Sequence, residues 1–262
     1  MLTRPAVPGT AVAGGDVSVT IADGIGTISF SHPKSNSLPG ALLRRLAEAI
    51  TWLGKDPAAR VIVLRSEGTG PFCAGASFDE LVSIADVEEG TEFFSGFARV
   101  ILAMVRAPKF VVVRVHGRTA GGGVGIVAAG DYSFAVRGAS AKLSELAVGI
   151  GPFVVGPVIE RRIGPGPYSA MSVDADWRDA EWGERHALYS RTFDDVASMD
   201  ASINALAGTL AASNPEAMEA MKRVFWEGTE NWDALLAKRA AMSGTLVLSE
   251  FTRAAIAKFK AR

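Results

Sequence analysis

Residues 109–145, KFVVVRVHGRTAGGGVGIVAAGDYSFAVRGASAKLSE, constrain the fold more than any other part of this chain. Residues 110–113 are aromatic and β-branched, which predicts a buried strand. Gly117 interrupts that pattern, and a helix is expected to begin near the glycine triplet 121–123. The free backbone N–H groups and the positive dipole end of such a helix would face whatever lies above the strand. The sequence therefore predicts an anion site at this strand end.

Glu145 follows in the mostly apolar segment LSELAVGIGPF. Apolar surroundings raise the pKa of a carboxyl group toward the range that suits a base. A helix-capping or salt-bridged glutamate is the alternative interpretation. We expect Glu145 to be a general base.

The glycines also permit two other interpretations. Gly123, Gly125 and Ala128 satisfy the dinucleotide-binding pattern G-x-G-x-x-G/A, and Glu145 lies at the distance expected of a ribose-binding acid. However, the glycines do not follow the strand at once, and the next expected strand, 131–136, arrives too early for a crossover helix. Alternatively, the glycines only allow a helix to pack closely on a strand.

Composition and charge set limits on both structure and partners. The 262 residues are 48% hydrophobic and 21% charged, enough for a full core in one large domain or in a domain with an appendage. The net charge of −1 gives no excess of positive charge that would attract nucleic acid. No apolar run approaches the roughly 18 residues that a membrane-spanning helix needs. We therefore expect neither nucleic acid nor membrane partners. One cysteine, Cys73, and a loose tail over residues 1–16 without an apolar core favour a cytoplasmic protein.

Strands and helices alternate before the central stretch. Residues 17–21 and 26–30 alternate around Asp23 and Gly24, which predicts a hairpin. Apolar residues at helical spacing follow from Leu42, and residues 61–64 form a buried strand. A glycine-rich loop then leads to a short helix over 78–84 and a phenylalanine-rich helix before Pro108.

Three motifs in order carry a family resemblance: FCAGASFDEL, HGRTAGGGVG and KLSELAVGIGP, followed by SNPEAM. Over roughly residues 17–262 the chain resembles the crotonase (enoyl-CoA hydratase/isomerase) superfamily. The resemblance implies an α/β fold, a spiral of strand-strand-helix repeats in residues 17–195, and a C-terminal helical trimerisation region in residues 196–262. It also implies a homotrimer or dimer of trimers, a role in fatty acid metabolism and an acyl-CoA thioester substrate. Coenzyme A would then be part of the substrate, with no permanently bound cofactor.

The motifs also imply the catalytic groups. A thioester that becomes an enolate carries charge on its oxygen, and two converging backbone N–H groups can hold that oxygen. Matching the motifs gives Ala76 and Gly122 for these donors and Glu145 for the base. Family hydratases carry a second glutamate at the position of Gly125, which is expected to face the water beside Glu145. One base suffices to move a double bond, so an isomerase is favoured. A one-glutamate hydratase and a non-catalytic acyl-CoA binder or assembly subunit remain open.

Further substrate contacts follow from the same motifs. The loop HPKSNSL contains Lys34, Ser35 and Ser37. In members of the family the corresponding loop contacts the nucleotide part of CoA, largely through backbone atoms. Ser77 replaces a frequent aspartate, and Phe153 is expected in the wall of the acyl pocket. The predicted substrate-binding residues are Lys34, Ser35, Ser37, Ala74, Ser77, Phe78, Gly125 and Phe153.

Other chemically capable residues rank lower. Cys73 has no histidine near it in sequence to act as its base, so a packed core residue is the better interpretation. Asp131 and Tyr132 could reach the site, although a surface turn is simpler. His32, His116 and His186 lack the spacing of a metal site, and no metal is expected.

Overall fold

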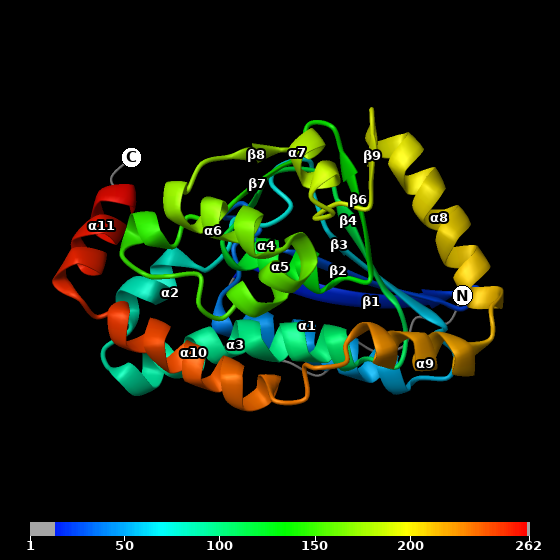
Figure 1. Cartoon of the computed structure of the whole chain (residues 1–262), viewed down its shortest axis with the longest axis horizontal. Coiled ribbons are helices and arrows are strands. Elements are labelled where there is room, and N and C mark those ends of the chain that lie inside the picture. The colour runs from blue at the N-terminus through cyan, green and yellow to red at the C-terminus, as the bar shows by residue number, and fades with distance from the viewer. Residues whose placement is uncertain (1–13, 261–262) are drawn as a thin grey trace.

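The computed structural model describes residues 14–260, and a six-stranded sheet forms its centre (Figure 1). The strand order is β1-β2-β3-β4-β6-β9, with an antiparallel β1-β2 hairpin followed by parallel neighbours. The interior strands are almost continuous runs of buried β-branched residues, as expected for parallel strands covered on both faces. The strands are β1 (Asp16–Ala22), β2 (Ile25–Ser31), β3 (Val61–Ser66), β4 (Val111–Val115), β6 (Tyr132–Val136) and β9 (Arg191–Phe193).

Helices cover the two faces of this sheet. The amphipathic helix α1 (Gly40–Lys55) buries Leu42, Leu46 and Leu53 and packs on β1, β2 and β3. Helix α8 (Val196–Ala212) packs on β2, β3, β4, β6 and β9, and Figure 1 shows it on the other side of the sheet from α1. The interior strands β3 and β4 are therefore buried on both faces, whereas alternate residues of the edge strand β1 are exposed.

A second, three-stranded sheet lies beside the carboxyl ends of the central strands. It has the order β5-β7-β8, with β5 (Thr119–Ala120), β7 (Ser140–Lys142) and β8 (Arg178–Asp179). Helix α4 (Gly122–Ala129) follows β5 directly, and the 3-10 helix η1 (Leu146–Val148) follows β7. The pairing of β5 with β7 thus brings the glycine triplet and Glu145 to the same edge.

The remaining helices build the walls around that edge. Helix α3 (Val87–Arg106) packs against α1 on one side and against α10 (Trp232–Leu246) on the other. Helix α11 (Glu250–Lys260) contacts α2 (Phe78–Ser83) and η1. The other helices are α5 (Gly156–Ile163), α6 (Pro165–Asp174), α7 (Ala180–Arg185) and α9 (Pro215–Phe225).

The structure confirms the elements expected from sequence, including the hairpin, the strand-helix-strand order of residues 109–136 and the C-terminal helices. Of the expected tail, residues 1–13 lie outside the described part of the chain, while Asp16 already pairs with Ser31 in β1. Sequence patterns did not predict β5 or β7, because strands of two or three residues are too short to show alternation. None of the helices within residues 14–260 combines the length and apolar character needed to cross a membrane.

Candidate active site

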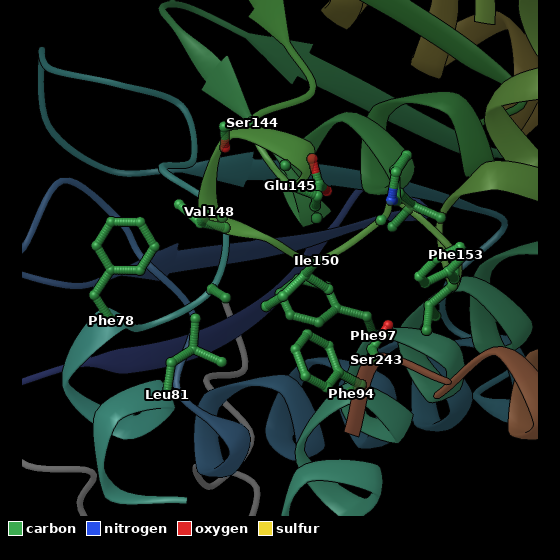
Figure 2. Close-up of a pocket in the computed structure, with 18 of the residues that line it drawn as sticks. Phe78, Leu81, Phe94, Phe97, Ser144, Glu145, Val148, Ile150, Phe153 and Ser243 are labelled. Atoms are coloured by element: carbon green, nitrogen blue, oxygen red, sulfur yellow. The ribbon is translucent and has the colours of Figure 1, made fainter. Parts of the chain in front are cut away.

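A pocket with about 560 Å³ of empty space, part of it open to solvent, lies where the glycine loops, η1 and helices α2, α3 and α10 meet (Figure 2). Its walls are mostly apolar, with four phenylalanines, and Figure 2 shows Ser144 and Glu145 on one side of it. Largely apolar walls with few polar groups are typical of a ligand site. The lining residues are Ala74, Gly75, Ala76, Phe78, Leu81, Phe94, Phe97, Gly121, Gly122, Ser144, Glu145, Val148, Ile150, Gly151, Pro152, Phe153, Val154, Val155 and Ser243.

Ala76 lines this pocket, and its backbone N–H is not used in pairing with the neighbouring segment. The segment around it pairs with Leu38 as a parallel bridge, in which the Leu38 N–H donates to the Gly75 carbonyl and the Ser77 N–H to the Leu38 carbonyl. In such a bridge the N–H of the intervening residue points away from the partner strand. The Ala76 N–H is therefore left for a ligand. Gly75 has a φ of +84°, and a Cβ there would lie 2.9 Å from the Ala120 oxygen, so glycine is required.

Gly122 supplies a second free N–H. It is the first residue of α4, so its N–H has no intrahelical carbonyl partner. The loop before it is fixed, because Ala120 N–H donates to the Cys73 carbonyl and Gly121 N–H to the Lys142 carbonyl. A Cβ at Gly122 would lie 2.1 Å from Phe97 Cε1, so the phenyl ring occupies the space of a side chain. Ala76 and Gly122 are thus two backbone donors that line one pocket.

Glu145 lies over the glycine triplet. A Cβ at Gly121 would be 3.3 Å from Glu145 Oε1, which shows how closely the carboxyl group approaches that loop. The backbone is held because both Val148 and Ile150 donate their N–H groups to the Glu145 carbonyl, at 3.2 and 2.9 Å. The residue as a whole is half-buried, yet Oε2 is enclosed and accepts no hydrogen bond from any described residue. One carboxylate oxygen therefore remains available for a ligand.

The surroundings of Glu145 favour its neutral form. Burial raises the pKa of this carboxyl group to about 7, although the backbone N–H groups of Glu145 and Ser144 act in the opposite direction. At neutral pH both protonation states are then populated. A group of this kind can take a proton and return it, which is what a general acid-base catalyst requires.

The raised pKa of Glu145 predicts a stability change with pH. Between pH 4.5 and about 7 the folded state keeps a proton that the unfolded state has released, so wild-type stability falls as pH rises through this window. Glu145→Gln removes the titration. We expect its free energy of unfolding to match the wild type below this window and to exceed it by up to about 3 kcal/mol at pH 8. Denaturant unfolding of both proteins across pH measures the difference, and parallel pH curves would exclude this environment for Glu145.

Gly125 does not face open space. A Cβ built there would lie 2.5 Å from Val155 Cγ1 and 2.7 Å from Val155 Cβ. The sequence-based expectation of a water space beside this position is therefore not met, because Val155 fills it. Gly125 is buried within α4, while Val155 itself lines the pocket.

The predicted substrate-binding residues divide into two groups. Ala74, Phe78 and Phe153 line the pocket. Ser77 instead accepts a hydrogen bond from the Glu80 N–H at 3.5 Å as the N-cap of α2, and it is buried. A capping hydroxyl explains why serine can stand at this position.

The loop with Lys34, Ser35 and Ser37 borders the pocket without lining it. The exposed Lys34 forms an ion pair with Asp79, and Ser37 Oγ lies 3.1 Å from His32 Nδ1. The Ser35 carbonyl accepts a hydrogen bond from the Ala74 N–H, so this loop adjoins the segment that presents Ala76.

The lower-ranked candidates lie elsewhere in the fold. Burial raises the pKa of the Cys73 thiol to about 12, and Cys73 packs against Gly123, so it is a core residue. Asp131 is buried in an ion pair with Lys222, and the Tyr132 ring packs against Phe134. In the described part of the chain, no three His, Cys, Asp or Glu side chains are grouped so that they could hold a metal ion.

Sequence reasoning missed several pocket residues. Phe94 and Phe97 were expected only as apolar residues of a helix, because core and pocket phenylalanines show the same spacing. Ser144 and Ser243 gave no signal at all. Ser243 lies on α10, about a hundred residues beyond Glu145, and a single serine in a helix matches no motif.

Comparisons with known proteins identify the family of this chain. The family model described as Enoyl-CoA hydratase/isomerase matches residues 20–253. The chain is 29% identical over 199 residues to "Methylglutaconyl-CoA hydratase, mitochondrial" of Rattus norvegicus, covering 74% of this chain and 63% of that protein. It is 33% identical over 117 residues to a Rhodococcus jostii "(7aS)-7a-methyl-1,5-dioxo-2,3,5,6,7,7a-hexahydro-1H-indene-carboxyl-CoA hydrolase", covering 45% of each chain. The matches thus span about half to two thirds of these relatives' lengths.

Solved structures share the fold. An enoyl-CoA hydratase from Bacillus halodurans superimposes with a TM-score of 0.85 at 19% identity, covering 92% of this chain and 99% of that one. An enoyl-CoA hydratase from Mycobacterium avium gives 0.83 at 24% identity, covering 94% and 96%. Both similarities establish the architecture, a crotonase fold. Because the family model matches most of the length of this chain, the chain belongs to the enoyl-CoA hydratase/isomerase family.

Proposed function

We propose that this protein shifts a C=C double bond in an acyl-CoA thioester, with Glu145 as its single base. The thioester oxygen would bind between the N–H groups of Ala76 and Gly122, and the acyl chain would occupy the apolar pocket. Removing one such oxyanion donor typically costs about 2.7 to 4 kcal/mol of transition-state stabilisation. Coenzyme A is part of the substrate in this proposal, and no resident cofactor takes part.

The proposed reaction balances with one carboxylate. Glu145 removes a proton from C2 of a 3-enoyl thioester, and the electrons of that C–H bond delocalise onto the thioester oxygen. The resulting dienolate then takes the same proton from Glu145 at C4, so that the double bond lies between C2 and C3. A pKa of about 7 suits both half-reactions, since the carboxylate must accept the proton and later release it.

One observation carries the preference for isomerisation. Glu145 is the sole carboxyl side chain among the described residues that line the pocket, and Val155 fills the space next to Gly125. Adding water to a double bond requires the water itself to be held and deprotonated, for which a second acid is normally used. Moving a proton between two carbons of one substrate needs a single base.

The direct test compares two substrates of equal chain length, a 3-enoyl-CoA and a trans-2-enoyl-CoA. We expect the first to be converted to the conjugated isomer, and the second to be hydrated far more slowly. Faster hydration than isomerisation would overturn the proposal in favour of a hydratase. Binding of both thioesters without proton exchange at C2 would indicate a non-catalytic acyl-CoA binder.

Hydratase activity is the second candidate, because several relatives carry that name. They include the methylglutaconyl-CoA hydratase above, a "Probable enoyl-CoA hydratase" of Bacillus subtilis and a "Crotonyl-CoA hydratase" of Syntrophomonas wolfei. In that case Glu145 alone would have to hold the water. The substrate comparison separates the two activities.

Restoring the second acid tests the role of Val155. Gly125→Glu places its Cβ against Val155, and overpacking of this kind typically costs about 1 to 3 kcal/mol. We therefore expect the single variant to lose stability and to gain no hydration of a trans-2-enoyl-CoA. The paired variant Gly125→Glu with Val155→Gly removes the clashing atoms and should hydrate faster than the single variant. A stable single variant with raised hydration would contradict the observed packing.

A homotrimer, or a dimer of trimers, remains our proposal for the assembly. Helix α9 exposes Met221, Val224 and Phe225, and α11 exposes Phe251, each with about half or more of its surface accessible. Exposed apolar residues on C-terminal helices are typical of subunit contacts. Sedimentation of the purified protein would measure the state directly.

A further inference from the structure

Ser243 is a polar group at the otherwise apolar end of the pocket. Figure 2 shows its side chain with Phe94, Phe97 and Phe153, across the pocket from Ser144 and Glu145. The residue has a relative accessibility of 1%, and it comes from α10, whereas Glu145 lies in the loop after β7. The polar side chains of the pocket thus occur in two separate places.

The hydroxyl of Ser243 has no partner within the described chain. Serine and threonine in helices often donate to the carbonyl four residues earlier, as Thr245 does to Ala241 at 3.0 Å. No such bond is found for Ser243 among the described residues. Its oxygen is also not one of the fully enclosed atoms that lack a partner, which fits a hydroxyl that is open to the pocket it lines. A buried hydroxyl of this kind is stabilised when a partner reaches it.

The packing of α10 on α3 holds Ser243 in this place. A Cβ at Gly90 would lie 2.9 Å from Gly244 Cα, and a Cβ at Gly244 would lie 2.6 Å from the Thr91 nitrogen. The two glycines therefore let the helix backbones touch. Because Gly244 directly follows Ser243, this contact fixes the serine beside Phe94 and Phe97 of α3.

We infer that Ser243 selects acyl groups that carry a neutral oxygen, a ketone or a hydroxyl, near the end remote from the thioester. This inference rests on the proposed function, because it assumes that the thioester carbonyl binds near Ala76, Gly122 and Glu145. A purely hydrocarbon tail would leave the Ser243 hydroxyl buried without a partner.

A terminal carboxylate fits this end of the pocket poorly. None of the described residues that line the pocket is a lysine, arginine or histidine. A buried carboxylate without a cation or several donors is strongly unfavourable, whereas one hydroxyl can satisfy a ketone or share a hydrogen bond with an alcohol. The pocket chemistry therefore favours a neutral oxygen over a charged one.

The test measures affinity by calorimetry for matched acyl-CoA thioesters. One series comprises saturated acyl-CoAs from butanoyl to decanoyl, and the second carries a ketone on the penultimate carbon of each chain. At the chain length that reaches Ser243, we expect the oxo compound to bind about 10-fold more tightly than its plain counterpart. Ser243→Ala should abolish this preference while plain acyl-CoAs still bind, which also shows that the variant is folded.

Thr245→Ala is the matched control, because it removes a hydroxyl from the exposed side of the same helix. It should keep the preference for the oxo series. Equal binding of both series by the wild type at every length, or a preference that survives Ser243→Ala, would overturn the inference while leaving the proposed function intact. Tighter binding of a chain-terminal carboxylate would overturn the choice of a neutral oxygen. Failure of every acyl-CoA to bind would refute the proposed function as well.

Discussion

Glu145→Gln is expected to lower proton exchange at C2 of a bound acyl-CoA by about 10²- to 10⁴-fold, the usual contribution of a positioned acid-base group. The change keeps the size of the side chain and removes its ability to accept a proton. Affinity for the thioester should stay within a few fold, because the backbone donors and apolar walls are untouched. Deuterium uptake from heavy water, followed by mass spectrometry, measures the exchange.

Two further readouts separate a base from a merely structural residue. Wild-type exchange should rise with pH through about 7, because the ionised Glu145 is the active form, and the residual exchange of the variant should lack this step. Glu160→Gln makes the same chemical change at an exposed position of α5 and should exchange like the wild type. Wild-type exchange rates in Glu145→Gln would mean that another group removes the proton.

The ends of the pocket differ in how far the sequence could predict them. Ala76, Gly122 and Glu145 belong to three local motifs, and each motif fixes the backbone around its own functional atom. The glycine triplet predicts a helix start, and a helix start leaves free N–H groups whatever surrounds it. The motif resemblance predicted these three positions, and the structure places all three in one pocket, through the pairing of Leu38 with Ala76 and of β5 with β7. Their catalytic roles stay a prediction.

The opposite wall depends on tertiary packing. Val155 fills the space beside Gly125 only because α5 packs on α4, and no pattern in either segment specifies that contact. Ser243 reaches the pocket because Gly90 and Gly244 let α10 approach α3. Contacts between residues so far apart in sequence carry no periodic signal, so the shape of the acyl pocket could not be derived in advance.

The surroundings of Asp131 likewise could not be predicted from local sequence. At the sequence level a surface turn was the simpler interpretation, yet its side chain is buried and paired with Lys222 at 2.8 Å. Asp131 also accepts hydrogen bonds from the Val111 N–H and the Trp226 indole N–H, at 2.7 and 3.2 Å. The partner lies on α9, which no local pattern connects to β6.

Lys222→Met is expected to destabilise the protein by about 3 to 5 kcal/mol, the usual effect of breaking a buried ion pair. Lys222 has a relative accessibility of 2%, and besides Asp131 it donates to the carbonyls of Met104 and Lys109, at 2.7 and 2.8 Å. A methionine at position 222 leaves the buried Asp131 carboxylate without its cation. It also leaves the carbonyls of Met104 and Lys109 without the lysine as hydrogen-bond donor. Burial already lowers the pKa of Lys222, and Asp131 is the group that opposes this shift.

Paired variants separate the ion pair from the loss of packing. Lys238→Met changes an exposed lysine on α10 and should alter stability by less than about 0.5 kcal/mol. The double variant Lys222→Met with Asp131→Asn removes the carboxylate that lost its lysine partner. The amide oxygen of the new asparagine can still accept a hydrogen bond from Val111 or Trp226. We therefore expect the double variant to regain part of the lost stability. This recovery follows because much of the single-variant cost is the uncompensated carboxylate rather than the pair itself. A double variant less stable than Lys222→Met would show instead that Asp131 stabilises the fold chiefly through its hydrogen bonds to Val111 and Trp226.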